Sequence, residues 1–349
     1  MTLGEFFAVL FSAPAFCVSA VLICGVMFVN GWTDAPGAIT AAVSTNAITM
    51  KKAAALAAVF NFVGALVMGI FSPSVMRSVG EITMLIGTGE NANLILCAAL
   101  LSIIIWAILA WLFGIPTSES HALISGILGA AMATGINFTD ESLSALRLAI
   151  AGLVFSIPIG CGMGFFFAKL LEIIFKSHKI KNKESIIKKG QIFGASSMAF
   201  MHGAQDSQKF VGVLIAAMCM TSTVPSHIGF NNVPLWMTVF CSLIIALGTS
   251  VGGYRIIKRV GMKTVKLNHL TGLASDISGS LCMLIASVGG IPVSTTHTSS
   301  ASIIGAGIAG GRKNANISSM QEMLIAWVLT FPCCCGMAYL IAKIFIWLF

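Results

Sequence analysis

Charged residues are scarce in this chain. Asp, Glu, Lys and Arg together make up 9% of the 349 residues, whereas a soluble domain carries about 25%. Hydrophobic residues make up 57%, and the mean hydropathy is +0.96. This composition excludes an ordinary water-soluble domain. Apolar stretches of about 20 residues, enough to cross a hydrocarbon core as a helix, recur along the chain, so we expect an all-α integral membrane protein.

Signatures of several other protein classes are also missing. The sequence has no Gly-x-x-x-x-Gly-Lys-Ser/Thr loop for nucleotides. Its ten cysteines include no Cys-x-x-Cys, and we interpret them as small buried hydrophobes. The formal net charge of +8 is typical of cytoplasmic membrane loops rather than of a nucleic-acid reader. We expect no resident cofactor and no nucleic-acid partner.

The apolar segments predict about ten helical passes, counting half-helices. The first, 6–48, is interrupted at 30–36 and is too long for one straight crossing. We interpret it as one broken or steeply tilted helix that puts the N-terminus outside; two full spans would put it inside. The other segments are 53–71, 94–113, 118–136, 146–175, 192–220, 235–252, 270–288, 294–309 and 323–348.

Basic residues predict the topology, because Lys and Arg favour cytoplasmic loops. One basic loop holds Lys176, Lys179, Lys181, Lys183, Lys188 and Lys189, and another holds Arg255, Lys258, Arg259, Lys263 and Lys266. The segments 72–93, 137–144 and 221–234 hold a single base, Arg77, and suit the outside. Five passes in each half then give two inverted repeats, residues 1–175 and 190–349, joined by a cytoplasmic linker at 176–189.

Two motifs each occur twice, about half a chain apart. Asn30-Gly31-Trp32-Thr33-Asp34 returns as His202-Gly203-Ala204-Gln205-Asp206, and Pro116-Thr117-Ser118-Glu119-Ser120-His121 returns as Pro292-Val293-Ser294-Thr295-Thr296-His297. Both lie in apolar sequence. Duplicated polar motifs of this kind are typical of transporters built from inverted repeats.

The Pro motifs predict two half-helices that begin inside the membrane. Pro is tolerated in a first helical turn and hydroxyls cap free N–H groups, but the remaining N–H groups still need a partner there. An anion fits, because a helix N-terminus offers aligned donors and a partial positive charge. We expect a tetrahedral oxyanion, inorganic phosphate, to be bound by the hydroxyls of Thr117, Ser118, Ser120, Ser294, Thr295 and Thr296.

Asp34 and Asp206 are candidates for a coupling-cation site, because a carboxylate within a membrane span is expensive and usually functional. Na⁺ is the natural ligand and a proton is its rival; Asp34 as the N-cap of an outer helix end is the structural alternative. Asn30 would supplement the cation site and Gln208 the phosphate site. Lys209 would either neutralise Asp206 or snorkel to the surface.

The remaining polar residues in these segments carry weaker expectations. Glu119 would either help to couple the cation or face a helix flank without a role. For His202, one helical turn before Asp206, we favour a structural hydrogen bond over metal binding. His121 and His297 would orient the half-helices, and Asp276 is a weaker intramembrane candidate.

In these four motifs the chain resembles the inorganic phosphate transporter (PiT) family of ion-coupled phosphate carriers. The matching residues are Asn30-Gly31-x-x-Asp34, His202-Gly203-x-x-Asp206-x-Gln208-Lys209, Pro116-x-Ser118-x-Ser120-His121 and Pro292-x-Ser294-x-Thr296-His297. The resemblance implies that acidic and amide residues contribute to cation sites. Thr33, Gln205 and Gly37 stand where the family pattern has Asn, which leaves the coupling ion open.

These features predict a secondary active transporter in a prokaryotic cell membrane. It would import phosphate with Na⁺ or H⁺ by alternating access; the rival is a permease for sulfate or another oxyanion. An intramembrane hydrolase is disfavoured, because Ser120 and His121 are adjacent and point about 100° apart on a helix. The expected partners are phosphate, the coupling cation and the lipid bilayer, and a homo-oligomer stays open.

Overall fold

The computed structural model describes residues 2–89, 91–115, 117–135, 138–177, 182–221, 230, 233–251, 257–258 and 264–349. The regular elements in these ranges are helical, apart from one isolated bridge between Val265 and Ala315. Several residues used in the sequence analysis lie outside the described ranges, namely Pro116, Asn137, Lys179, Lys181, Arg255, Arg259 and Lys263.

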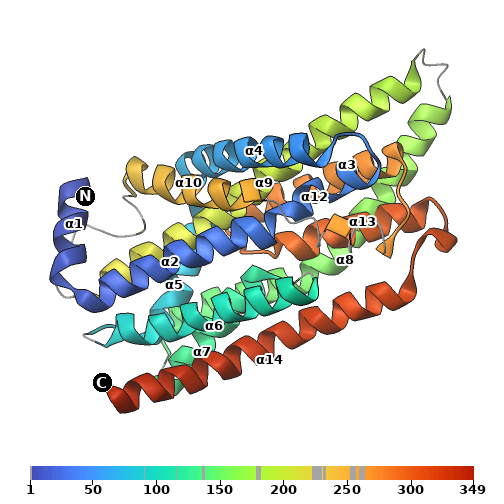
Figure 1. The fold of residues 1–349 in the computed structure, drawn as a ribbon. Helices are drawn as coiled ribbons and strands as arrows, with labels where there is room; N and C mark the ends of the chain where they lie inside the picture. The colour runs from blue at the N-terminus through green and yellow to red at the C-terminus, as the bar shows by residue number, and fades with distance from the viewer. Residues whose placement is uncertain are drawn as a thin grey trace.

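The helices form one elongated bundle with both chain termini at the same end and the α8–α9 junction at the other (Figure 1). The first half comprises α1 (Leu3–Ser12), α2 (Pro14–Thr33), η1 (Ala35–Ile39), α3 (Thr40–Ser44), α4 (Met50–Phe71), α5 (Ser74–Thr83), η2 (Met84–Ile86), α6 (Ala92–Phe113), α7 (Glu119–Thr134) and α8 (Asp140–Ser177). The second half comprises α9 (Lys183–Cys219), α10 (Leu235–Val251), α12 (His269–Val288), α13 (Thr295–Ala309), η4 (Arg312–Asn314) and α14 (Ile317–Leu348).

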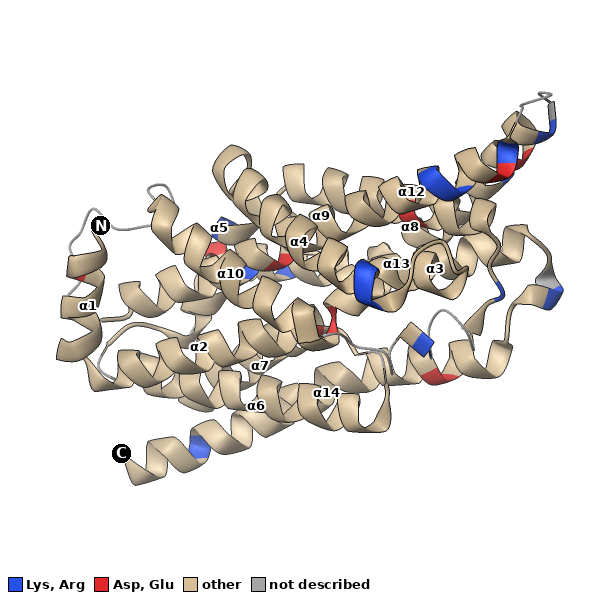
Figure 2. Cartoon of the chain, turned by 45° about the horizontal axis from the view of Figure 1, so that its top comes forward, with Lys and Arg blue, Asp and Glu red and all other residues tan. Residues whose placement is uncertain are grey.

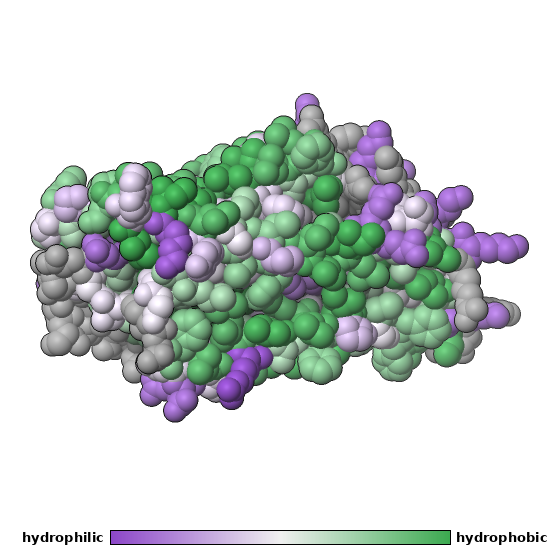
Figure 3. All heavy atoms as spheres, turned by 90° about the horizontal axis from the view of Figure 1, so that it is seen from below, coloured by the Kyte–Doolittle hydropathy of each residue, from purple (hydrophilic) through white to green (hydrophobic). Residues whose placement is uncertain are grey.

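The bundle has the surface of a membrane protein. Among the described residues, six helical segments are long and apolar enough to cross a bilayer: Pro14–Ser44, Met50–Phe71, Ala92–Phe113, Asp140–Lys176, His269–Val288 and Ile317–Leu348. Large hydrophobic side chains cover much of the face in Figure 3. Lys and Arg gather toward the end that holds the α8–α9 junction (Figure 2). The count of ten passes and the inverted relation of the halves stay predictions.

The first long segment is broken, as expected, but it also contains an unforeseen boundary. Helix α2 ends at Thr33, and a 3₁₀ helix follows that contains Pro36 and Gly37. Pro36 has no N–H for an α-helical hydrogen bond, which explains the change of helix type. Upstream, Pro14 starts α2 at its first position after the extended residue Ala13. The prediction of a single break, at 30–36, is therefore incomplete, because α1 is a separate helix that ends before Ala13.

Helix α5 lies in the segment 72–93 that we interpreted as an outer connection. Its polar residues hide it from hydropathy, but Val75, Met76 and Val79 are buried and α5 packs against α9. In contrast, α9 is absent from the six apolar spans because its buried residues include Asp206, Gln208 and Lys209. The polar face of α9 thus lies inside the protein.

The two halves exchange helices in the sense that helices of each half pack against helices of the other half. Helix α8 packs on α13 while α14 packs on α7, and α4 packs on α9 while α10 packs on α2. Two glycines make the first exchange possible: a Cβ on Gly129 of α7 would collide with the Cys335 carbonyl of α14, and a Cβ on Gly305 of α13 would collide with the Cys161 carbonyl of α8. Close backbone approach between helices is typical of small residues in membrane proteins.

Gly129→Ala and Gly305→Ala should therefore each destabilise the protein by about 1–3 kcal/mol, the usual cost of overpacking. Gly336→Ala is the matched control, because this exposed glycine of α14 has no atom within 4 Å of the added Cβ. The measurement is the melting temperature of purified protein in detergent. Equal melting temperatures for all three variants would show that the helices do not approach this closely.

Candidate functional site

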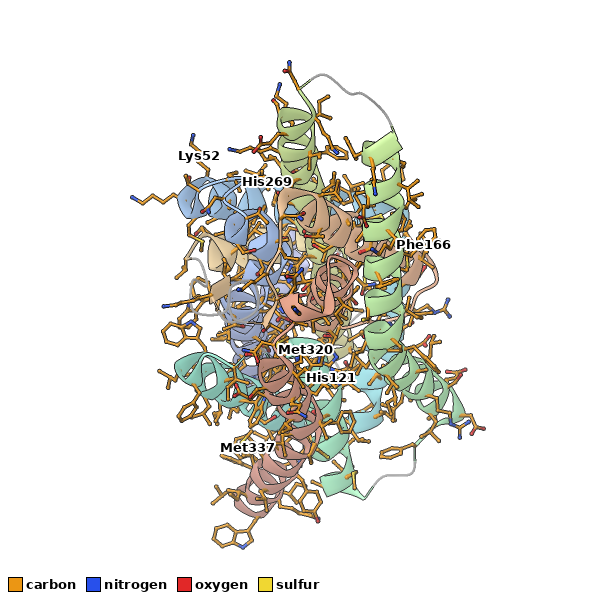
Figure 4. The ribbon with its side chains drawn as sticks, turned by 90° about the vertical axis from the view of Figure 1, so that its right-hand side faces the viewer. Lys52, His121, Phe166, His269, Met320 and Met337 are labelled. Atoms are coloured by element: carbon orange, nitrogen blue, oxygen red, sulfur yellow. The ribbon has the colours of Figure 1, made fainter. Side chains whose placement is uncertain are left out.

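Helices α7 and α13 begin inside the bundle and face one another. The Ser118 hydroxyl caps α7 by accepting from the His121 N–H at 3.2 Å, and the Ser294 hydroxyl caps α13 by accepting from the His297 N–H at 3.0 Å. Both serines are fully buried. The rings of His121 and His297 lie 4.3 Å apart, and His121 lies within the bundle in the end-on view of Figure 4. The expected pair of buried helix N-termini is present, with a histidine contact between them.

Asp34 lies at the break after α2 and is 3% exposed. Its Oδ1 accepts a hydrogen bond from the Thr296 hydroxyl in the first turn of α13. Its Oδ2 is buried without a hydrogen-bond partner, and the side chain caps no helix. The alternative role as an N-cap at an outer helix end is therefore wrong.

Asp206 joins both halves of the chain. Its Oδ2 accepts from the Asn30 amide at 3.1 Å and from the Thr295 hydroxyl at 3.3 Å. Its Oδ1 lies 2.7 Å from the ammonium of Lys209. Asn30 comes from α2 and Thr295 from α13, so the carboxylate links three helices.

Lys209 is 2% exposed, so the snorkelling alternative is wrong. Besides the ion pair with Asp206, its Nζ donates to the Ser120 hydroxyl at 2.6 Å and to the Val293 carbonyl at 2.8 Å. These contacts match the three donors of an ammonium group. Lys209 thereby ties α9 to the start of α7 and to the residue before the Ser294 cap.

Glu119 completes a cluster of three buried carboxylates. Its Oε1 accepts from the Thr33 hydroxyl at 3.2 Å, and its Oε2 has no hydrogen-bond partner. Among the described residues, the only Lys or Arg that forms an ion pair with this cluster is Lys209, which pairs with Asp206. Asp34 and Glu119 are therefore left without a contacting basic side chain. Because burying an uncompensated charge costs several kcal/mol, this arrangement favours a bound cation or proton.

His202 lies beside the same carboxylates. Its Nε2 is 3.3 Å from Asp206 Oδ2, but neither ring nitrogen has a hydrogen-bond partner. Asp34, His202 and Asp206 each offer one ligand atom, and these atoms all lie within 4.8 Å of one another. The three side chains are thus close enough to surround one ion.

Other predicted residues lie away from these contacts. The Gln208 carbonyl oxygen accepts from the Val75 N–H at 3.2 Å, and its amide donates to the Met68 carbonyl at 3.5 Å. Gln208 therefore caps α5 and contacts α4 in this structure. Asp276 is buried on α12 beside Gly194 of α9, with Oδ2 unpartnered. Thr117 is 8% exposed and precedes the Ser118 cap.

Sequence reasoning missed three contributors. The Thr33 hydroxyl bonds Glu119, the Val293 carbonyl bonds Lys209, and the Gln205 amide donates to the Ile291 carbonyl at 3.4 Å. Thr33 and Gln205 stand in the two motifs, which was the available signal. The sequence contains no signal for the Val293 carbonyl, because the position of a backbone acceptor depends on the path of the chain and not on residue type.

The site is closed to solvent, because the hydroxyl, carboxylate and ammonium groups described above belong to side chains at most 8% exposed. A closed polar centre inside a multi-pass helical bundle is typical of membrane transport proteins. Residues 30–338 match the model of the phosphate transporter family. The chain belongs to this family, whose members are transporters and not enzymes, and it is a multi-pass cell membrane protein.

Individual relatives support the same family assignment. The chain is 34% identical over 314 residues to a probable low-affinity inorganic phosphate transporter of Bacillus subtilis, covering 89% of this chain and 92% of the relative. It is 35% identical over 310 residues to a protein of the same description from Rhizobium meliloti, covering 87% and 89%. A solved structure described as the sodium-dependent phosphate transporter superposes with a TM-score of 0.78 at 21% identity, over 96% of this chain and all of that one. That likeness shows the fold.

The Asp206–Lys209 pair should be strongly coupled. Asp206→Asn and Lys209→Met each strand a buried charge, which costs about 3–5 kcal/mol, whereas the double variant removes both charges and should recover most of that loss. Melting temperatures in Na⁺-free buffer measure the cycle. The control is Lys169→Met, which breaks an exposed ion pair of the same spacing and should cost at most about 1 kcal/mol. Additive losses in the double variant would contradict the pairing.

Proposed function

We propose that this protein is a secondary active transporter that imports inorganic phosphate with Na⁺ by alternating access. The observation that carries the proposal is the meeting of two buried, Ser-capped helix N-termini with carboxylates that lack a contacting basic partner. The helix N-termini favour an anion and the carboxylates favour a cation. A site that attracts both ions together fits cotransport.

The anion would lie between the starts of α7 and α13. Ser118, Ser294, Thr295 and Ser120 have hydroxyls there, and Lys209 brings an ammonium to Ser120. In the closed structure these groups are partly occupied by Asp34 and Asp206, through Thr296 and Thr295. Entry of phosphate would therefore exchange carboxylate contacts for phosphate contacts.

The cation would lie at Asp34, within reach of oxygen ligands from both halves. Thr296 contacts Asp34, and Glu119 and Asn30 each keep a buried oxygen without a hydrogen-bond partner. Oxygen ligands suit a hard cation such as Na⁺, and the description of the solved structure as sodium-dependent adds support. A proton on Asp34 or Glu119 is the alternative coupling ion.

Alternating access would use the inverted repeats 1–175 and 190–349 around the linker 176–189. Equivalent close contacts support the two-fold relation: Gly31 of α2 meets the Ile245 carbonyl of α10, and Gly203 of α9 meets the Asn61 carbonyl of α4. Gly31 and Gly203 occupy the same motif position. The clustering of basic residues toward the α8–α9 end (Figure 2) supports a cytoplasmic linker.

Phosphate uptake into proteoliposomes tests the function. An inward Na⁺ gradient should drive uptake of labelled phosphate that excess sulfate does not abolish, because Glu119 or Asp34 can accept the proton that monohydrogen phosphate carries and sulfate lacks. Vesicles with an inward H⁺ gradient, and vesicles without a gradient, are the controls. Uptake driven by an H⁺ gradient alone would show that the coupling ion is H⁺. Loss of phosphate uptake in excess sulfate would show that the protein is an oxyanion permease of different specificity.

Removing the cap hydroxyls should weaken phosphate binding. Ser118→Ala and Ser294→Ala should each raise the KM for phosphate about tenfold or more, as expected for loss of a hydrogen bond to a charged group, and Ser→Thr should restore it. Cap loss also costs about 0.5–2 kcal/mol of stability, so uptake is normalised to folded protein. Ser250→Ala, at an exposed hydroxyl of α10, is the control. An unchanged KM in both alanine variants would refute the phosphate site.

A further inference from the structure

At one position, three residues after the aspartate, the duplicated motifs differ in charge. Lys209 follows Asp206 by three residues, whereas Gly37 follows Asp34 by three residues. Lys209 places its ammonium against the Asp206 carboxylate. Gly37 lies in the 3₁₀ helix after Asp34 and has no side chain to play that part. The Asp206 carboxylate thus has a positively charged partner from the chain itself, and the Asp34 carboxylate has no such partner at the matching position.

The surroundings of the Lys209 ammonium resemble those of a bound cation. Three oxygens contact it: Asp206 Oδ1 at 2.7 Å, Ser120 Oγ at 2.6 Å and the Val293 carbonyl at 2.8 Å. A carboxylate, a hydroxyl and a backbone carbonyl are also the kinds of ligand that hard cations take.

The repeats define the equivalent position in the other half. In the aligned motifs, Asp206 corresponds to Asp34, Ser120 to Thr296 and Val293 to Thr117. Thr296 already contacts Asp34 through its hydroxyl, and the second oxygen of Asp34 is buried without a partner. Asp34 and Thr296 thus supply a carboxylate and a hydroxyl there, and the motif alignment predicts that the Thr117 carbonyl is the third oxygen, with no ammonium among them.

We propose that the Lys209 ammonium is a tethered cation, which permanently fills one of two equivalent cation positions and leaves the Asp34 position as the one that exchanges Na⁺. The inference rests on the proposed Na⁺-coupled function and deepens it. Lys209 cannot be displaced by Na⁺ without breaking three buried contacts, so the Asp206 position does not exchange its cation. Removing the ammonium should turn the Asp206 position into a second Na⁺ site.

Binding of radioactive Na⁺ to the purified full-length protein tests this directly. Lys209→Met should bind one more Na⁺ per molecule than the wild type, and the Hill coefficient for Na⁺ should rise from about 1 to about 2 when both sites are linked. Lys209→Arg keeps the charge, and the double variant Asp206→Asn with Lys209→Met removes the new ligand. Both should keep the wild-type stoichiometry.

Thermal melts give a second readout. Lys209→Met should melt at a much higher temperature in Na⁺ than in choline, because a ligand that binds only the folded state stabilises it, and the double variant should lose this extra shift. Lys209→Gln, which keeps a donor without the charge, serves the same test if Lys209→Met yields no folded protein.

The outcomes separate this inference from the proposed function. Equal Na⁺ stoichiometry in the wild type and in the single variants Lys209→Met and Lys209→Gln would overturn the tethered cation, even if phosphate uptake is normal. An extra Na⁺ bound by these two single variants would support the tethered cation. It would do so even if the wild type transports no phosphate, a result that would refute the proposed function alone. A gain that persists in the double variant would also overturn the tethered cation, because the new ligand would not be Asp206.

Discussion

Buried charge is the constraint on which the rest of this structure depends. Asp34, Glu119, Asp206 and Lys209 lie inside a helical bundle, where each ion loses several kcal/mol of hydration that protein contacts must replace. The replacements come from all parts of the chain: hydroxyls of Thr33, Ser120, Thr295 and Thr296, the Asn30 amide and the Val293 carbonyl. The helix breaks and half-helices follow from this need, because a continuous α-helix offers no free backbone groups in its interior.

The exchange of helices between the halves holds these groups in place while keeping the halves distinct. Helix α8 from the first half supports α13, and α14 from the second half supports α7, so each half-helix is held by a long helix of the other half. The contacts at Gly129 and Gly305 bring the backbones together, and little sliding is possible at such contacts. Motion between halves is therefore more compatible with rigid rotation of paired elements than with independent movement of α7 or α13.

The sequence predicted the parts of the site that are repeated. Asp34 and Asp206 were found because they are acids in apolar sequence, and the starts of α7 and α13 because a Pro-Ser/Thr turn occurs twice. What it could not predict depends on which segments meet. Gln208 fits a polar site as well as it fits its observed role at α5, and its neighbour Lys209 was equally compatible with the surface. Hydropathy does not predict helix α5, because a short helix buried on one face has no apolar run. It does not predict the break at Ala13 either, because Pro14 lies within a longer apolar stretch.

Charge balance also sets an order of events. With the three carboxylates ionised and Lys209 protonated, the closed site carries a formal charge of minus two, and a phosphate dianion would double that charge in a medium of low dielectric constant. Such a state is unfavourable even with two helix N-termini, each of which contributes about half a positive charge. Neutralisation at Asp34 and Glu119 therefore has to accompany or precede anion binding. In the proposed transport cycle, phosphate would then not be enclosed without its coupling cation, and this obligatory pairing would allow a cation gradient to drive transport.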